Sequence, residues 1–122
     1  HLYQAVGWTN YTHQPQMLEK ALSHSLAIYL ALDGDAVVGL VRLVGDGFSS
    51  VFVQDLIVLP CHQRQGIGSD LMKEALGDYK DAYQVQLVTE QTEKTLGFYR
   101  SLGFETLSTY DCTGMIWVDR KK

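Results

Sequence analysis

The chain has few cysteines, few prolines and no long apolar run, and these shortages exclude several classes of protein. Its two cysteines, Cys61 and Cys112, are too few for a disulfide scaffold, and no cluster of His and Cys predicts a metal site. No apolar stretch reaches the roughly 20 residues that span a bilayer, and the start shows no signal-peptide pattern. We therefore expect a cytoplasmic protein that does not enter a membrane.

Basic residues are scarce as well. The 10 Lys and Arg are outnumbered by 14 Asp and Glu, which gives a net charge of −4. Because nucleic acids are bound through clustered Lys and Arg, we expect no nucleic-acid partner. The 122 residues, 46% of them apolar, suffice for one core, and we expect a single domain over residues 1–122.

Hydrophobic periodicity predicts an α+β protein with a mixed, mostly antiparallel sheet flanked by helices. Helices are predicted over residues 15–23, 67–79 and 92–102, the last with Gly103 as its C-cap. Strands are predicted over residues 26–33, 36–44, 50–58, 83–89, 104–110 and 114–118. Short glycine-containing turns join the first three strands, which are therefore expected to pair antiparallel.

The segment HQRQGIGSDLMKEAL, residues 62–76, places two glycines where a loop meets a predicted helix. A helix start has unpaired N–H groups and a positive dipole end, and glycines let the backbone approach an anion closely. A nucleotide P-loop is excluded because no Gly-Lys-Ser or Gly-Lys-Thr follows Gly66, and a dinucleotide fingerprint because Leu71 takes the place of its third glycine. Two interpretations stay open, an anion site and a glycine-rich helix cap without a ligand.

Two motifs carry a family resemblance. Gln63-x-x-Gly66-x-Gly68, preceded by LIVLP, resembles the Q/R-x-x-G-x-G/A segment of the GNAT superfamily of acetyl-CoA-dependent N-acetyltransferases. FYRSLGF at 98–104 is similar to the FY-x-x-x-GF signature of the same family, and the order of elements agrees over nearly the whole chain. VGW near the start, the Asp46-Gly47 turn, Asp55 and GMIW resemble bacterial and plant-plastid members that include arylalkylamine acetyltransferases.

The resemblance implies that the loop binds the pyrophosphate of acetyl-CoA at the helix start. The residues that it assigns to this loop are Gln63, Arg64, Gln65, Gly66, Ile67, Gly68 and Ser69. Arg64 either pairs with a phosphate or is a solvated surface arginine. The pantetheine arm is expected beside the backbone of Leu56, Ile57 and Val58. Thr92 stands where many members carry an Asn, so one hydrogen bond to the cofactor is expected to differ.

The resemblance also implies the chemistry. Tyr99, in the second motif, is expected to give a proton to the leaving sulfur, because a phenol is protonated at neutral pH. A backbone amide near residues 56–58 is expected to stabilise the oxyanion. Asp55 interrupts the apolar run VFVQDLIV and is the candidate base for the amine. Glu90 or a chain of waters is the alternative base, and Asp55 is alternatively a structural hydrogen-bond partner.

The acceptor is the least defined part of the site. In the family the segment near the start lines the acceptor pocket, which here assigns Trp8 and Tyr11, with His13 nearby, to substrate binding. The same aromatic residues alternatively pack between the first two helices. A small aryl or alkyl amine, a polyamine, a peptide N-terminus and a protein lysine all stay open. The family begins with a strand, whereas LYQAVGW at the start of this sequence resembles the family's first helix, so we expect a homodimer or an upstream segment at the sheet edge.

These observations predict an N-acetyltransferase that moves an acetyl group from acetyl-CoA to a primary amine by direct attack in a ternary complex. The alternative is a non-catalytic acyl-CoA-binding sensor or regulatory module, and the presence of Tyr99 and Asp55 counts against it. A structural domain without a ligand would leave both motifs as a coincidence.

Overall fold

The structure, a computed structural model, describes residues 2–5, 7 and 9–119. The chain forms two compact units, His1–Leu87 and Val88–Lys122. Within the described ranges, no helix is both long enough and apolar enough to cross a bilayer. The sheet lies wholly within the first unit.

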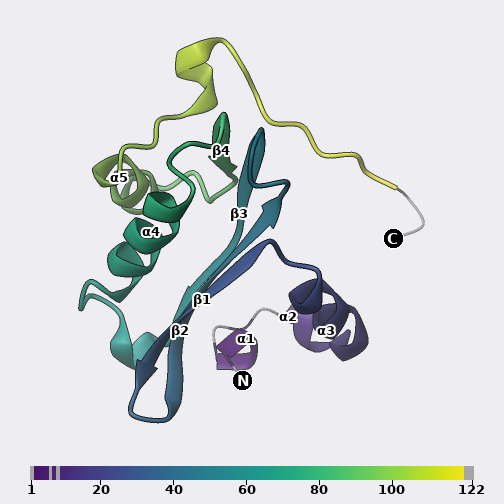
Figure 1. Cartoon of the computed structure of the whole chain (residues 1–122), viewed down its shortest axis with the longest axis vertical. Helices are drawn as coiled ribbons and strands as arrows, with labels where there is room; N and C mark the ends of the chain where they lie inside the picture. Colours follow the sequence, from purple (N-terminus) through teal and green to yellow (C-terminus); the bar gives the residue numbers. More distant parts are fainter. Residues whose placement is uncertain (1, 6, 8, 120–122) are drawn as a thin grey trace. The chain divides into compact units, whose positions relative to one another are not determined.

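A four-stranded sheet is the centre of the first unit. In chain order this unit contains α1 (Leu2–Ala5), α2 (Thr9–Thr12), α3 (Pro15–Ser23), β1 (Ala27–Asp33), β2 (Ala36–Gly45), β3 (Ser50–Val58), the 3-10 turn η1 (Pro60–His62), α4 (Ile67–Asp78) and β4 (Gln84–Leu87). The strands lie in the order β1-β2-β3-β4, antiparallel except for the parallel pair β3–β4 (Figure 1). The predicted fold class, a mixed and mostly antiparallel sheet flanked by helices, is confirmed.

Helices cover both faces of this sheet (Figure 1). On one face Gly39 of β2 leaves room for α4, since a Cβ added to Gly39 would lie 3.2 Å from Cδ1 of Leu71. On the opposite face Leu40 of β2 joins a buried cluster with Tyr3 of α1 and Ile57 of β3. The side chains of successive strand residues point to opposite faces of the sheet. Gly39 therefore faces α4, and its neighbour Leu40 faces α1.

The third strand, β3, is irregular in its middle and runs beyond its neighbour. Arg42 of β2 pairs with Asp55, whereas the next residue of β2 pairs with Val53, so Gln54 is the extra residue of a β-bulge. β4 pairs only with Ser50–Val53 of β3. Beyond this range the outer edge of β3 has no strand beside it in the described sheet.

The second unit contains α5 (Glu93–Ser101) and the 3-10 turn η2 (Leu107–Tyr110). The Thr92 hydroxyl caps the start of α5 by accepting a hydrogen bond from the N–H of Thr95 at 3.2 Å. At the other end Gly103 has a φ of +100°, and the N–H of Phe104 donates to the carbonyl of Tyr99 at 3.0 Å. This is a Schellman C-cap, which explains physically why FYRSLGF contains a glycine. The predicted helix and its cap are confirmed.

The two closing strands predicted over 104–110 and 114–118 are wrong. Residues 107–110 form η2, and residues 112–119 have no regular secondary structure. The Thr106 hydroxyl bonds to those of Ser108 at 3.0 Å and Thr109 at 3.3 Å, and such local bonds compete with strand pairing. The apolar residues of 114–118 have high β-propensity, but this propensity is expressed only where a neighbouring strand offers packing.

Candidate active site

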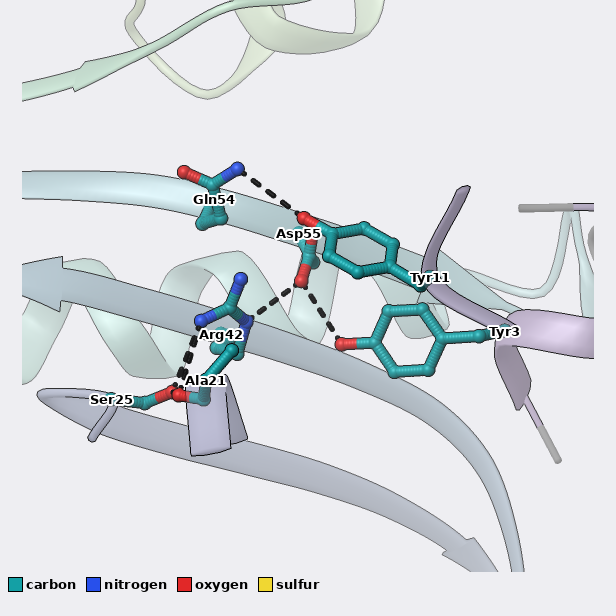
Figure 2. A network of polar contacts seen from close by, with 7 residues as sticks. All are labelled: Tyr3, Tyr11, Ala21, Ser25, Arg42, Gln54 and Asp55. Carbon is teal, nitrogen blue, oxygen red and sulfur yellow. Dashed lines mark hydrogen bonds and ion pairs between the residues drawn. The ribbon is translucent and has the colours of Figure 1, made fainter. Parts of the chain in front are cut away.

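A buried ion pair stands beside the bulge of β3. Nε of Arg42 lies 2.7 Å from Oδ2 of Asp55, and the two side chains are 5% and 1% exposed. Figure 2 shows that the two residues come from the adjacent strands β2 and β3. Removing one partner of a buried ion pair destabilises a protein by about 3–5 kcal/mol, because the other charge is left buried and uncompensated. Arg42 and Asp55 therefore each require the other.

Three short N-terminal helices contribute to this ion pair. The hydroxyls of Tyr3 in α1 and Tyr11 in α2 donate to Oδ2 and Oδ1 of Asp55, at 3.0 and 3.2 Å (Figure 2). Arg42 Nη1 donates to Oγ of Ser25 at 3.2 Å and to the carbonyl of Ala21 in α3 at 3.4 Å. No buried side-chain nitrogen or oxygen of the described residues lacks a hydrogen-bond partner. The network is therefore fully satisfied, as a buried polar cluster must be.

This environment favours the structural alternative for Asp55. Both carboxylate oxygens accept hydrogen bonds, and the charge is balanced by Arg42. Burial and then the Asp55 charge raise the pKa of Tyr3, so this phenol keeps its proton. Burial lowers the pKa of Arg42, but the bond to Asp55 and its charge outweigh this effect and the net shift is upward. The Asp55 side chain is 1% exposed, so an amine in solvent has no direct access to its carboxylate oxygens.

The structure describes only some of the residues predicted to bind the acceptor substrate. Tyr11 is half-buried and its hydroxyl points to Asp55, while Nε2 of the exposed bulge residue Gln54 lies 3.4 Å from the same hydroxyl (Figure 2). Trp8 lies outside the described residues. His13 is exposed and lines an open hollow of about 710 Å³ together with Gln14, Pro15, Gln16, Met17 and Lys20.

The glycine loop has the geometry that the sequence predicts. Gly66 is the N-cap of α4 with a φ of +82°, and no side chain caps the N–H groups that follow it. Arg64, also with a positive φ of 65°, and the neighbouring residues 63–66 are exposed. The unpaired amides of the first turn of α4 therefore remain available to an anion.

The strand before the loop is joined to it by a side chain of the motif. Nε2 of Gln63 donates to the carbonyl oxygen of Val58 at 3.0 Å. Leu56 and Val58 are half-buried, whereas Ile57 is 2% exposed and lies in the core cluster. Gln63 therefore fixes the loop to the end of β3, whereas Ile57 contributes its side chain to the core and pairs through its backbone with Leu40 of β2.

The remaining predicted residues belong to the second unit. Tyr99 packs edge-on against Phe98 and Phe104, with ring centroids 5.0 and 5.8 Å away. Burial raises the pKa of Tyr99, and a hydrogen bond with Thr89 offsets part of the rise. The Thr92 hydroxyl is used as the cap of α5, and Glu90 is exposed.

Arg42 and Tyr3, which both bond directly to Asp55, are among the members of the network that sequence reasoning missed. The signal for Arg42 was present, because AVVGLVRLV and VFVQDLIV each carry a charged residue in an otherwise apolar strand. The two charges have opposite signs and the strands are consecutive, so antiparallel pairing brings them face to face. Tyr3 has no comparable signal, since its partner lies far along the chain.

The chain is similar to proteins of one family. The family described as "Acetyltransferase (GNAT) domain" matches residues 24–106, which include both motifs. A solved structure of a GNAT-family acetyltransferase from Streptococcus pneumoniae TIGR4 is 81% identical, with a TM-score of 0.90, over 98% of this chain and 87% of that one. A GNAT-family acetyltransferase from Elizabethkingia anophelis, solved with acetyl-CoA bound, shares the fold at 20% identity and a TM-score of 0.65, over 97% and 78% of the two chains.

A plant protein is also similar. "Serotonin N-acetyltransferase 2, chloroplastic" of Oryza sativa subsp. japonica is 30% identical over 95 residues, which are 75% of this chain and 48% of that protein. The chain thus spans about half the length of this curated relative.

We predict that replacing Arg42 is far more costly than replacing a surface arginine. Arg42→Met leaves the Asp55 charge buried without a cation, and we expect a loss of about 3–5 kcal/mol in the free energy of unfolding. Arg100→Met is the matched control, because its pair with Glu105 is largely exposed and should leave stability almost unchanged. Urea denaturation measures both, and equal small losses would contradict the role given to the ion pair.

Proposed function

Because the chain belongs to the GNAT acetyltransferase family, we propose that it is an N-acetyltransferase that moves an acetyl group from acetyl-CoA to a primary amine by direct attack in a ternary complex. The observation that carries the proposal is Gly66 in left-handed geometry at the uncapped start of α4, joined through Gln63 to the end of β3. Acetyl-CoA supplies an activated thioester, and the chain supplies the groups that bind and orient it.

The loop residues fit the diphosphate of this ligand. The N–H groups at the start of α4 have no capping side chain, and the exposed loop lets a phosphate approach them. Space next to Gly66 is open, because a Cβ added there would meet no atom within 4 Å. Arg64 is exposed beside these amides and is the candidate for a charge contact. The related protein that was solved with acetyl-CoA bound supports the ligand class.

The outer edge of β3 is the proposed path of the pantetheine arm. β4 stops pairing at Val53, so the backbone of the following residues has no strand on that side in the described sheet. The N–H of Leu59 donates to Val38 on β2, and strand groups alternate, so the polar groups of Val58 and Leu56 face away from β2. One of these edge amides is the proposed donor to the oxyanion.

Tyr99 is the proposed acid for the leaving sulfur. Its pKa is raised by burial, so its hydroxyl stays protonated over the whole neutral range. For Asp55 the contacts support a positioning role, in which it fixes the bulge at Gln54 and the helix that carries Tyr11. The amine proton then goes to Glu90 or to a chain of waters.

An amine with an aromatic or alkyl body is the proposed acceptor class. Tyr11 beside Gln54 and the net charge of −4 support a cationic substrate with an apolar body. The rice relative is named for serotonin, which is such an amine. A homodimer is proposed at β1, an edge strand whose Ile28, Leu30 and Leu32 are 38%, 51% and 61% exposed.

Calorimetric titration with acetyl-CoA tests the ligand. We expect saturable binding of acetyl-CoA and of desulfo-CoA, which keeps the diphosphate, and no binding of ATP. Turnover with a panel of amines then separates an enzyme from a non-catalytic acyl-CoA sensor. Absence of acetyl-CoA binding would overturn the proposal.

A substitution at Gly66 tests where the ligand binds. An alanine at a φ of +82° is strained by about 1–2 kcal/mol, so we expect Gly66→Ala to weaken acetyl-CoA binding by roughly tenfold. Gly77→Ala, in the same helix and with open space around it, is the matched control and should leave the affinity unchanged. Equal affinities in the two variants would place the ligand elsewhere.

Removal of one hydroxyl tests the acid. We expect Tyr99→Phe to lower kcat by about 10²–10⁴-fold with little change in the affinity for acetyl-CoA, because only proton donation is lost. With Tyr99 intact, ionisation of its phenol should not reduce kcat below about pH 10. Unchanged turnover in the variant would exclude Tyr99 as the acid.

A further inference from the structure

A cysteine, a histidine and an aspartate lie in a row at the surface, and none of the three is among the groups proposed for acetyl transfer. Sγ of Cys61 lies 3.1 Å from Nδ1 of His62, and Nε2 of the same ring lies 3.2 Å from Oδ2 of Asp33. Cys61 and His62 belong to η1, whereas Asp33 is the last residue of β1. The fold therefore brings together side chains from two separate segments.

The two contacts define the role of each ring nitrogen. A carboxylate only accepts hydrogen bonds, so Nε2 of His62 carries the proton that faces Asp33. In the neutral ring the other nitrogen, Nδ1, has a free lone pair, and this lone pair faces the thiol of Cys61. A nucleophile, a base and an orienting carboxylate in this order form the arrangement that activates cysteine and serine side chains.

The thiol is accessible, and the chain contains a matched control. Cys61 and Cys112 are both exposed free cysteines. Cys112 donates to the carbonyl oxygen of Tyr110 at 3.4 Å, and a backbone carbonyl cannot remove a proton from a thiol. In the described part of the chain, no three or more His, Cys, Asp or Glu side chains are arranged to hold a metal ion. The row at Cys61 is therefore suited to thiol chemistry and not to metal binding.

We propose that Cys61 is a nucleophilic thiol that exchanges with small disulfides, with His62 as its base and Asp33 as the residue that positions His62. The sulfur of Cys61 attacks one sulfur of a disulfide R–S–S–R and forms a mixed disulfide with it. The original S–S bond breaks, and RS⁻ leaves with its electron pair. The proton of Cys61 passes to Nδ1 of His62 and then to the leaving thiolate, so the small disulfide is the only oxidant.

The place of Cys61 connects this exchange with the glycine loop. Cys61 lies two residues before Gln63, whose side chain joins the loop to Val58. A mixed disulfide adds a bulky group at this junction, so modified protein should bind acetyl-CoA more weakly. That consequence rests on the proposed function, whereas the exchange itself does not.

The exchange rate of single-cysteine variants tests the proposal. Cys112→Ser leaves only Cys61, and Cys61→Ser leaves only Cys112. Each is mixed with excess 2,2′-dithiodipyridine, a neutral disulfide, and the released thione is followed by absorbance. We expect Cys61 to react at least about tenfold faster than Cys112. In the Cys112→Ser background, His62→Gln should slow the reaction by about tenfold and Asp33→Asn by a smaller factor, and both should be as folded as the parent by circular dichroism.

Two results obtained with the folded protein would overturn the proposal. One is an equal rate for the two cysteines in the folded protein, and the other is a Cys61 rate that does not respond to His62→Gln. The same reactions in guanidinium chloride are the control for the fold, and there the rates of the two cysteines should converge. If the two cysteines still react at different rates after unfolding, the difference comes from the residues next to each cysteine in the sequence. That result would also contradict the role of Asp33, which reaches His62 only in the folded protein.

Discussion

The first unit depends on the buried ion pair between Arg42 and Asp55. Neither charge is stable in the apolar interior alone, so every group that satisfies the pair must be in place. Tyr3 and Tyr11 bring α1 and α2 onto the sheet, and Arg42 reaches back to the carbonyl of Ala21 in α3. One pair of charges therefore determines how three short helices, none of them long enough to be stable alone, cover one face of the sheet.

The same pair fixes the geometry from which the candidate site is built. Asp55 follows the bulge residue Gln54, and β3 continues past the end of its pairing with β4. At the end of β3 the side chain of Gln63 bonds to Val58, and Gly66 then starts α4 in a left-handed conformation. In the described sheet, an unpaired strand edge and an uncapped helix start thus follow one another along the chain. Backbone amides placed in this way suit a long ligand with a diphosphate at one end.

Much of this could be predicted from sequence, because it depends on local patterns. The period of the apolar residues located β1–β3, α4 and α5, and the glycines located the loop and the cap at Gly103. The strand predicted over 104–110 does not form because Thr106 bonds locally to its neighbours, and the one over 114–118 does not form because, among the described residues, no neighbouring strand packs against it, and a propensity reveals neither. Asp55 stood out as a charge among apolar residues. Its role as a structural hydrogen-bond partner could not be predicted, because this role depends on where the fold places Tyr3. The contact of Asp33 with His62 is likewise a product of the fold.

If the amides at the start of α4 and along the outer edge of β3 bind acetyl-CoA as proposed, a ligand with the same diphosphate and pantetheine must change their chemical environment. Backbone amide chemical shifts from ¹⁵N-labelled protein, recorded during titration with desulfo-CoA, measure this change residue by residue. We expect the largest shifts at Gly66, Ile67, Gly68 and Ser69, with a second group at residues 56–58. Saturable shifts confined to other segments, with these amides unmoved, would contradict the proposed binding site.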